Sequence, residues 1–468
     1  MTVAQPDAPA LYPQTVTPPA NVLPLRKFVV RFLKNPLLAL PQPAYEQPII
    51  GLDSVRYRRV VWMMGPDLVE QVLIKQAGIF LKTPVEKRVF RRSLKDGVLS
   101  SDGPLWRWQR RTMAPLFRPA EVLKYLPGMA QPAEEVLAKW RASPPGSVQR
   151  VDHDMTEATF SVIARTMLQG REPGEAETIK RATSTLLRYI PWEIMYGVLN
   201  VPLWMPHPAS WLVSRATKRL RGAVGDIIAR RQAEGGGGDD LLGRLLEARD
   251  PDSGEPMDNE RLINNLLTLL EAGHETTARA LTWTLYLLAR APEWQDRVRA
   301  EIASVCGDGE IEAERVAALQ TTQQVLKESM RLYPPVPVMS RVATETVSVG
   351  GHEIPEDTMV VVPIFCIHRH TQLWSDPARF DPTRFAPERE AEFPRTQFMP
   401  FGAGPRICLG NAFAMAEATV ILATLIRAAR FDWDGRTKPE PVSRLTLQPR
   451  GGMPLHVTML GQKPLFYT

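Results

Sequence analysis

A glycine-rich segment that contains a cysteine constrains this chain most strongly. Residues 401–410 read Phe-Gly-Ala-Gly-Pro-Arg-Ile-Cys-Leu-Gly, and the apolar stretch over 411–430 predicts a long helix directly after them. Cys408 therefore precedes a helix N-terminus, whose free N–H groups and partial positive charge favour a thiolate. No second Cys or His stands at zinc-ligand spacing, so a single axial bond to the iron of a flat cofactor fits better. The alternative is a buried structural cysteine in a tight turn.

Composition excludes several classes of protein. With 468 residues, 44% of them apolar and 23% charged, the chain has ordinary globular usage and is not disordered. Three cysteines cannot form a disulfide framework, which favours a reducing compartment and predicts a cytoplasmic protein. The net charge of +6 comes with no nucleic-acid-binding motif, so no nucleic-acid partner is expected.

No transmembrane segment or signal peptide is predicted. The most apolar long stretch, 262–291, is interrupted by the charged or polar side chains of Glu271, His274, Glu275 and Arg279. The N-terminus has no basic region followed by an apolar core.

Periodicity predicts a mainly α fold with a minor β-sheet region (α+β) in a single large domain, 1–468. Within it, the proline-rich residues 1–45 are expected to be irregular. Strands are expected as a hairpin over 48–64, short strands over 344–363 and a hairpin over 440–460. Helices are expected from 66 to about 290, interrupted by a long loop at 79–104 and by the apolar stretch 190–211. Helices are expected to continue over 260–291, 292–305, 322–332 and 411–430.

Residues 401–410 resemble the haem-binding signature of the cytochrome P-450 superfamily, Phe-x-x-Gly-x-Arg-x-Cys-x-Gly. Every fixed position matches: Phe401, Gly404, Arg406, Cys408 and Gly410. Four further signatures follow the family's order, so the resemblance covers nearly the whole chain and is closest to a soluble, bacterial-type stand-alone enzyme. It implies the cytochrome P-450 fold and a haem b (iron protoporphyrin IX) cofactor, with Cys408 as the axial ligand of the haem iron.

The segment Ala272-Gly273-His274-Glu275-Thr276-Thr277 lies in the middle of a predicted helix. Ala272 and Thr276 share a face, where small side chains leave space against a flat cofactor. Gly273 disfavours a helix, and close approach to a ligand would explain it. An acid next to a hydroxyl can relay protons, although back-bonding threonines on a helix surface are the plain alternative. The resemblance implies that Thr276 hydrogen-bonds the bound oxygen and that Glu275 helps to deliver protons.

Trp106 and Arg110 present an indole N–H and a guanidinium on one helix face, which suits a carboxylate such as a haem propionate. A cation–π surface pair is the alternative. The resemblance implies that Arg341 and Arg406 bind the propionates as well, and that Ala272, Phe401 and Gly410 also contact the haem.

Glu328 and Arg331 are three residues apart on a helix, which alone indicates only a surface salt bridge. The segment 380–385, Phe-Asp-Pro-Thr-Arg-Phe, resembles a family motif in which a second arginine, here Arg384, joins that pair. The resemblance implies a buried structural triad that helps to retain haem.

Glu271 departs from the family pattern, in which this position is often apolar. A carboxylate there is costly unless it is paired. We expect it to pair with Arg91 or Arg92 or to meet a polar group of the substrate; the alternative is that it points to water or to a neighbouring helix. The resemblance implies a mostly apolar substrate pocket. Its predicted lining is Val89, Phe90, Leu269, Glu271, Ala272, Val336, Val338, Met339, Thr446 and Leu447. Residues 190–211 would cover its entrance as a lid, with contact to a membrane surface as the second possibility.

The resemblance implies a monooxygenase that inserts one atom of O2 into a largely apolar small molecule by hydroxylation or epoxidation. The chain leaves no room for a fused reductase, so a ferredoxin or flavodoxin with an NAD(P)H-dependent reductase is expected to supply electrons. Arg107 and Arg111 are expected to form the docking surface. A peroxygenase or isomerase, and a haem-based sensor, are the alternatives.

Overall fold

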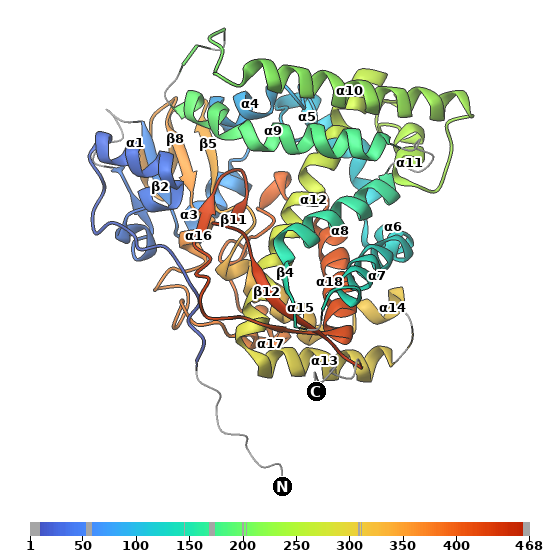
Figure 1. Ribbon diagram of the computed structural model, residues 1–468. Helices are drawn as coiled ribbons and strands as arrows, with labels where there is room; N and C mark the ends of the chain where they lie inside the picture. The colour runs from blue at the N-terminus through green and yellow to red at the C-terminus, as the bar shows by residue number, and fades with distance from the viewer. Residues whose placement is uncertain are drawn as a thin grey trace.

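A long buried helix, α12 (Asn259–Arg290), forms the centre of the fold and crosses the middle of the molecule in Figure 1. Its side chains are buried on most sides, the pattern of a helix enclosed by protein. Asp258 begins the helix by accepting a hydrogen bond from the backbone N–H of Arg261 at 2.8 Å. The computed structural model describes residues 10–52, 59–144, 146–167, 174–198, 201–202, 204–307, 309 and 311–461.

Further helices pack against α12 or against its neighbours. They are α7 (Leu126–Arg141), α8 (Val151–Met167), α13 (Pro292–Cys306), α15 (Gln320–Leu332) and α18 (Asn411–Ala428). Helix α8 lies along α12, and α18 packs against α7, α13 and α15. The helices predicted over 260–291, 292–305, 322–332 and 411–430 are thereby confirmed.

A separate layer covers α12 from above. It consists of α9 (Glu175–Val198) and α10 (Ser210–Ala233), which pack on each other, and α4 (Pro84–Arg91), which packs on α9 (Figure 1). The remaining α-helices are α1 (Leu25–Lys34), α3 (Pro66–Glu70), α5 (Gly103–Met113), α6 (Pro119–Val122), α11 (Leu241–Glu247), α14 (Ala313–Val316), α16 (Ile364–Ile367) and α17 (Pro387–Glu390).

The largest sheet lies at the left of Figure 1 and has the strand order β1-β2-β8-β5-β3. Strands β2 and β8 are parallel, and the other neighbours are antiparallel. The strands are β1 (Ile49–Ile50), β2 (Val60–Met63), β3 (Phe80–Leu81), β5 (Met339–Ala343) and β8 (Met359–Val362). The pairing of β1 with β2 confirms the hairpin expected over 48–64, whose turn lies largely outside the described residues.

Three small sheets complete the described strands. Strands β6 (Val347–Val349) and β7 (His352–Ile354) form a hairpin around Gly350-Gly351. Strands β10 (Pro441–Ser443) and β11 (Leu447–Pro449) form another, and β12 (Pro454–Met459) lies between β4 (Val148–Arg150) and β9 (Ala429–Asp432). The prediction of one hairpin over 440–460 was wrong in its pairing, because β11 pairs with β10, whereas β12 pairs with β9 and with β4, which is distant in sequence.

Three expectations of irregular structure also need correction. Residues 1–45 contain helix α1, whose sequence alternates basic and apolar residues with helical spacing. The expected loop at 79–104 contains β3 and α4. Thr83 caps the N-terminus of α4, where its hydroxyl accepts a hydrogen bond from the backbone N–H of Glu86. The stretch 190–211 continues α9 through Pro191 as far as Val198 and ends in the first turn of α10.

Among the described residues, α18 is the one helix with the length and apolar composition of a membrane span. Most of it is buried by the surrounding helices, so core packing accounts for its composition.

Candidate functional site

Residues 401–410, here called the cysteine loop, are held in a compact turn by hydrogen bonds within their own backbone. The N–H of Cys408 donates to the carbonyl oxygen of Phe401 at 2.9 Å, and the N–H of Ile407 donates to that of Gly404 at 3.0 Å. Gly404 has a φ of +73°, and a Cβ at this position would lie 2.0 Å from the carbonyl oxygen of Leu73. Only glycine satisfies both conditions, so the loop depends on this residue for its shape.

Cys408 lies three residues before Asn411, the first residue of α18, so it precedes the helix N-terminus as the sequence predicts. Its side chain is accessible but deeply set, and desolvation raises the pKa of the thiol. The N–H of Gly410 and the guanidinium of Arg110 lower this pKa, but they do not outweigh desolvation. The expected preference for the thiolate therefore does not arise from the protein alone; a bond from sulfur to a metal cation would supply the missing stabilisation.

Four cationic side chains gather beside the loop. Arg110 donates to the carbonyl oxygen of Ile407 at 2.6 Å, and Arg406 bonds Asp102 at 2.5 Å. Arg341 lies 3.7 Å from Glu86 and, with Arg110, contributes to lowering the pKa of Arg406 after the main effect of desolvation. Lys82 is also buried nearby, and its pKa is lowered by desolvation.

The carboxylates of Asp102 and Glu86 only partly compensate the positive charges of Arg110, Arg341, Arg406 and Lys82. An anionic group beside the cysteine loop is therefore favoured electrostatically. The alternative of a cation–π pair between Trp106 and Arg110 is not what the structure has, because the guanidinium of Arg406 lies 4.1 Å from the centre of the Trp106 ring.

The middle of α12 has an open side. Ala272 is exposed and Thr276, one turn later, is partly exposed, so the two share a face as expected. The hydroxyl of Thr276 donates to the carbonyl oxygen of Ala272 at 2.9 Å. Close approach to a ligand was the expected explanation for a glycine at position 273, but the structure gives a different one. A Cβ at this position would lie 2.9 Å from the side chain of Ile163 on α8. The glycine allows two helices to pack closely.

Glu275 is buried and turned toward the β10–β11 hairpin. One carboxylate oxygen accepts hydrogen bonds from Thr446 at 2.8 Å and from Gln448 at 2.7 Å, and Arg279 lies 3.5 Å away. The second oxygen, Oε2, has no hydrogen-bond partner among the described residues. One oxygen of this carboxylate is therefore fixed by its neighbours, and the other is buried without a hydrogen-bond partner among the described residues.

Glu271 is buried, and Oε2 accepts a hydrogen bond from the hydroxyl of Ser93 at 3.3 Å. Desolvation raises the pKa of the Glu271 carboxyl to about 8, with Glu275 adding to this effect. The prediction of an arginine partner was wrong, because Arg92 bonds Glu193 at 3.0 Å instead. Oε1 of Glu271 has no partner in the described part of the chain.

Glu328, Arg331 and Arg384 are brought together out of contact with water. Arg331 bonds both carboxylate oxygens of Glu328, at 2.7 and 2.8 Å, and Nε of Arg384 lies 3.7 Å from the same carboxylate. Arg331 also donates to the carbonyl oxygens of His368, Pro377 and Arg379. The pair therefore ties α15 to the segment 368–379, as a rigid support requires.

The predicted pocket residues fall into two groups. Five are partly exposed, in keeping with a lining role: Phe90, Leu269, Val336, Val338 and Met339. Met339 lies at the cysteine loop, since a Cβ on Gly402 would be 3.4 Å from its sulfur. Val89, Thr446 and Leu447 are buried, the last with its carbonyl oxygen bonded to Trp283, so the structure does not place these three at an open surface.

Sequence reasoning missed Glu417, an acid in the otherwise apolar helix α18. It is fully enclosed, and desolvation raises its pKa well above the usual range, with Thr277 of α12 close enough to oppose the shift. The signal was present in the sequence as a single carboxylate within the run 413–426.

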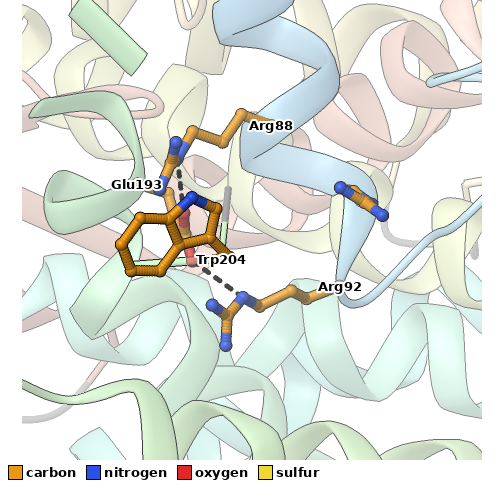
Figure 2. A pocket seen from close by; sticks show the side chains of 5 residues that line it. Arg88, Arg92, Glu193 and Trp204 are labelled. Carbon is orange, nitrogen blue, oxygen red and sulfur yellow. Dashed lines mark hydrogen bonds and ion pairs between the residues drawn. The ribbon is translucent and has the colours of Figure 1, made fainter. Parts of the chain in front are cut away.

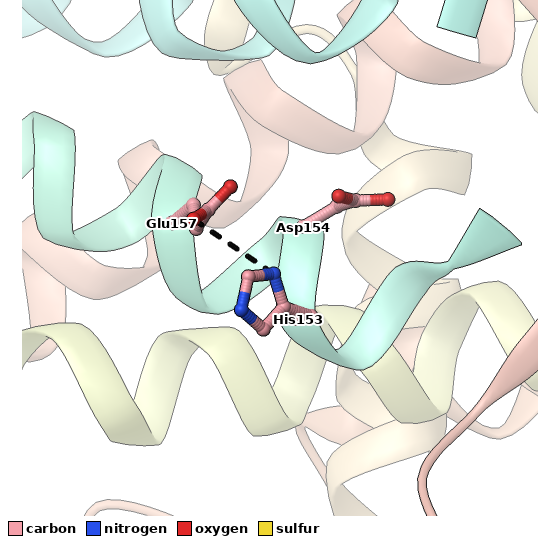
Figure 3. A group of neighbouring side chains, drawn as sticks. All are labelled: His153, Asp154 and Glu157. Atoms are coloured by element: carbon pink, nitrogen blue, oxygen red, sulfur yellow. Dashed lines mark ion pairs between the residues drawn. The ribbon is translucent and has the colours of Figure 1, made fainter. Parts of the chain in front are cut away.

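His153, Asp154 and Glu157 also converge, on α8, in an arrangement that could hold a metal ion (Figure 3). Asp154 already bonds Lys139 at 2.5 Å and Trp140 at 2.9 Å, and Glu157 bonds Lys180 at 2.9 Å. Ion pairs and hydrogen bonds within the protein account for the position of these side chains.

The comparisons with known proteins agree with this site. The family model described as Cytochrome P450 matches residues 45–455. Cyclooctatin synthase from Streptomyces melanosporofaciens is 30% identical over 97% of this chain and 96% of its own length. Cyclooctat-9-en-7-ol 5-monooxygenase from the same organism is 30% identical over 95% and 94%.

Among solved structures, the cytochrome P450DA heme domain superposes with a TM-score of 0.75 at 26% identity, covering 86% of this chain and 88% of that one. The cysteine loop at the start of α18, the α-rich fold and these whole-length matches agree, and the chain belongs to the cytochrome P450 family.

Proposed function

We propose that this haem b-dependent P450 monooxygenase inserts one oxygen atom from O2 into a largely apolar organic substrate, by hydroxylation or epoxidation, with electrons from a separate redox protein. The observation that carries the proposal is the accessible Cys408 thiol, held by a glycine-dependent loop at the N-terminus of α18. When bound, a haem with a thiolate ligand supplies the activation of O2.

The chain's own residues would hold that cofactor. Cys408 would bind the iron, and Arg110, Arg341 and Arg406 would bind the propionates, with the Trp106 indole N–H as a further donor. The gathering of like charges supports this assignment, because an anion would relieve it. Phe401 and Gly410 would complete the loop side, and Ala272 would leave room on the opposite side. Glu328, Arg331 and Arg384 would keep the support of the loop in place.

Thr276 and Glu275 would manage protons. Thr276 can turn its hydroxyl from the carbonyl oxygen of Ala272 toward the open side of α12. Glu275, fixed through one oxygen by Thr446 and Gln448, can accept a proton on Oε2 and pass it on toward Thr276.

The substrate would lie along the partly exposed apolar side chains Phe90, Leu269, Val336, Val338 and Met339. The name of one relative, cyclooctat-9-en-7-ol 5-monooxygenase, describes oxidation of an unsaturated alcohol. An apolar molecule with few polar groups fits this lining, and Oε1 of Glu271 is one group that could receive a hydroxyl.

The electron donor would be a ferredoxin or flavodoxin reduced by an NAD(P)H-dependent reductase, and the enzyme would work in the cytoplasm as one domain. The expected docking residue Arg111 is already bonded to Asp250 at 3.2 Å and also contacts Asp252, whereas Arg107 is exposed. Arg107 therefore remains the better docking candidate of the two.

The carbon monoxide difference spectrum of the reduced protein tests the haem assignment. We expect a strongly red-shifted Soret band that disappears in Cys408→Ser. A normal band in that variant, or well-folded protein that binds no haem, would overturn the assignment.

Product formation per NAD(P)H consumed, with added redox partners, tests the oxygenase assignment. Thr276→Ala is expected to lower product by roughly a hundredfold. Thr277→Ala serves as the control, because Thr277 is buried on the side of α12 next to Glu417 of α18 and not on the open side. An equal effect of both variants would contradict the role of Thr276.

A further inference from the structure

Two buried acids lie one helical turn apart in the middle of α12. Glu271 is 8% and Glu275 is 3% exposed, and their spacing of four residues places the two Cβ atoms about 6 Å apart on one side of the helix. Each carboxyl group has one oxygen bonded to a neighbour, which is Ser93 for Glu271 and Thr446 for Glu275. The other oxygens, Oε1 of Glu271 and Oε2 of Glu275, are buried and have no hydrogen-bond partner among the described residues. Buried polar atoms are normally paired, so both oxygens require a partner that these residues do not supply.

No described side chain supplies Glu271 with a counter-charge. Two arginines of α4, Arg88 and Arg92, pair with Glu193 instead (Figure 2). The bonded neighbour of Glu271 is the uncharged hydroxyl of Ser93, at 3.3 Å. An ionised Glu271 would therefore be an uncompensated negative charge in the interior, one turn from a second acid. The surroundings favour the protonated form, in agreement with the raised pKa of this carboxyl.

The positive charge beside the two acids suffices for one ionised carboxyl. Arg279 lies 3.5 Å from Oε1 of Glu275, and it also interacts electrostatically with Asp152 on α8, so its charge serves two acids. Desolvation lowers the pKa of His274, which adjoins Glu275, so this imidazole adds no charge at neutral pH. Nε of Arg279 is itself buried and unpaired within the described structure. Unpaired polar atoms therefore follow one another along α12 from Glu271 to Arg279.

We propose that a buried water joins Oε1 of Glu271 to Oε2 of Glu275, and that Glu271 passes its proton through this water to the acid of the active site. Buried waters bind two or more polar groups, and these two oxygens with Nε of Arg279 provide them. The inference rests on the proposed function, in which Glu275 delivers protons toward Thr276. An apolar residue at position 271 could not hold a proton, so the relay belongs to this chain and not to the family pattern.

The transfer conserves protons and charge. The O–H bond of the Glu271 carboxyl breaks as its proton moves to the water, and the water gives another proton to Oε2 of Glu275. The negative charge thereby moves from Glu275 to Glu271, whose Oε2 keeps the hydrogen bond from Ser93. Ser93 lies two residues before the exposed Lys95, so solvent on that side can return a proton to Glu271. A carboxyl O–H both donates and accepts, so Oε1 can also receive a hydroxyl of the substrate.

Infrared difference spectroscopy of the full-length, haem-loaded protein tests this link without turnover. The spectrum of the parent minus that of Glu271→Gln at pH 7 should contain the carbonyl stretch of a protonated carboxyl, and this band should shift in D2O. In Glu275→Gln the same band should move to a different frequency, because the far end of the link changes from a carboxylate to an amide.

Glu417→Gln is the matched control for the infrared test. Glu417 on α18 is also fully buried, and desolvation raises its pKa as well, so it contributes a carboxyl band of its own. That band should keep its frequency in Glu275→Gln. The comparison separates a link between Glu271 and Glu275 from a general change in the protein interior.

Turnover with added redox partners tests the role of the link. Glu271→Gln should lower product per NAD(P)H by roughly tenfold, less than Thr276→Ala, because Glu275 remains in place. It should also enlarge the solvent isotope effect on product formation. In the parent, product formation should fall as the pH rises through about 8, where Glu271 loses its proton, and this fall should be absent from the variant. Glu417→Gln should leave the isotope effect and the pH profile unchanged.

Two infrared results would overturn the proposal: no carboxyl band that depends on Glu271 at pH 7, or a band that does not respond to Glu275→Gln. If Glu271→Gln does not fold, Ser93→Ala and Glu275→Gln identify the band instead, because both should shift it. A parent spectrum that neither variant changes also overturns the proposal. The carbon monoxide spectrum reports separately on the haem, so a failure of the proposed function is distinguished from a failure of the relay.

Discussion

The support of the cysteine loop and the contact between α4 and α9 both depend on arginines, but the two regions are held in different ways. Arg331 is completely buried and uses all five of its N–H groups, two on Glu328 and three on backbone carbonyls. Arg92 is about one-third exposed and bonds Glu193, with Ser214 at 3.5 Å. Arg331, in the support of the cysteine loop, is held by more hydrogen bonds than are needed to fix its position. Arg92, at the contact between α4 and α9, can exchange its bonds with water.

This difference indicates a division of labour. A thiolate ligand needs a fixed position, which buried and fully bonded groups provide. In the α4, α9 and α10 layer the Arg88–Glu193 pair is buried, but the Arg92–Glu193 pair is partly exposed, so the latter contributes little free energy and can open at little cost. Substitutions on the two sides should therefore differ in size.

The largest effect is expected for Glu328→Gln. The change keeps the shape but leaves Arg331 as a buried cation without a counter-ion, which should lower the free energy of unfolding by about 3–5 kcal/mol. Urea denaturation measures this value, and the haem absorbance should fall with it. A loss below about 1 kcal/mol would show that the backbone carbonyls alone neutralise Arg331.

Gly404→Ala should come next, at about 2–3 kcal/mol. The new Cβ would meet the carbonyl oxygen of Leu73 and impose a side chain on a positive φ. Gly410→Ala is the matched control, because no protein atom lies within 4 Å of a Cβ there and its φ is −92°. Thermal unfolding of the two haem-free variants compares them, and equal melting temperatures would contradict the steric argument.

Glu271→Gln should change the pH dependence of stability by a smaller amount. The folded pKa of about 8 lies above the unfolded value near 4.5, so the folded state holds the proton more tightly. Stability from this group is greatest below about pH 4.5 and is lost as the pH rises toward 8. Between about pH 5 and pH 7 the parent should lose roughly 2 kcal/mol relative to Glu271→Gln. Parallel stability curves for the two proteins would argue against a neutral Glu271.

The smallest effect is expected for Arg92→Gln. Its partner Glu193 keeps Arg88, and the lost pair is partly exposed, so the free energy of unfolding should change by less than about 1 kcal/mol. Urea denaturation measures the change. A loss as large as that of Glu328→Gln would remove the distinction between the two regions.

Local signals in the sequence were sufficient for much of the fold. Glycines, prolines and apolar periodicity placed α12, α13, α15 and α18 to within a few residues, because these helices carry long, regular patterns. Helices α1 and α4 were missed, since short basic helices flanked by prolines resemble loops. The pairing of β12 with β4 joins segments hundreds of residues apart, for which local sequence has no signal.

The site residues also fall into those that the sequence could identify and those that it could not. Cys408 in its glycine-rich loop could be read from the sequence, because the loop and the helix after it are continuous in the chain. The partner of Glu271 could not, since it depends on which side chain of the α4–α5 connection meets α12. The same holds for Glu417, which faces Thr277 across two helices.

The sequence by itself determined the family, the position of the iron ligand and the main helices, because each depends on residues that are close together in the chain. Only the tertiary structure decided that Gly273 serves the packing of α8 on α12, that Arg92 belongs to Glu193, and that Arg406 covers Trp106. In each case several similar charged or small residues could have made the contact. Which of them does so depends on distances in the folded chain, and spacing in the sequence does not give these distances.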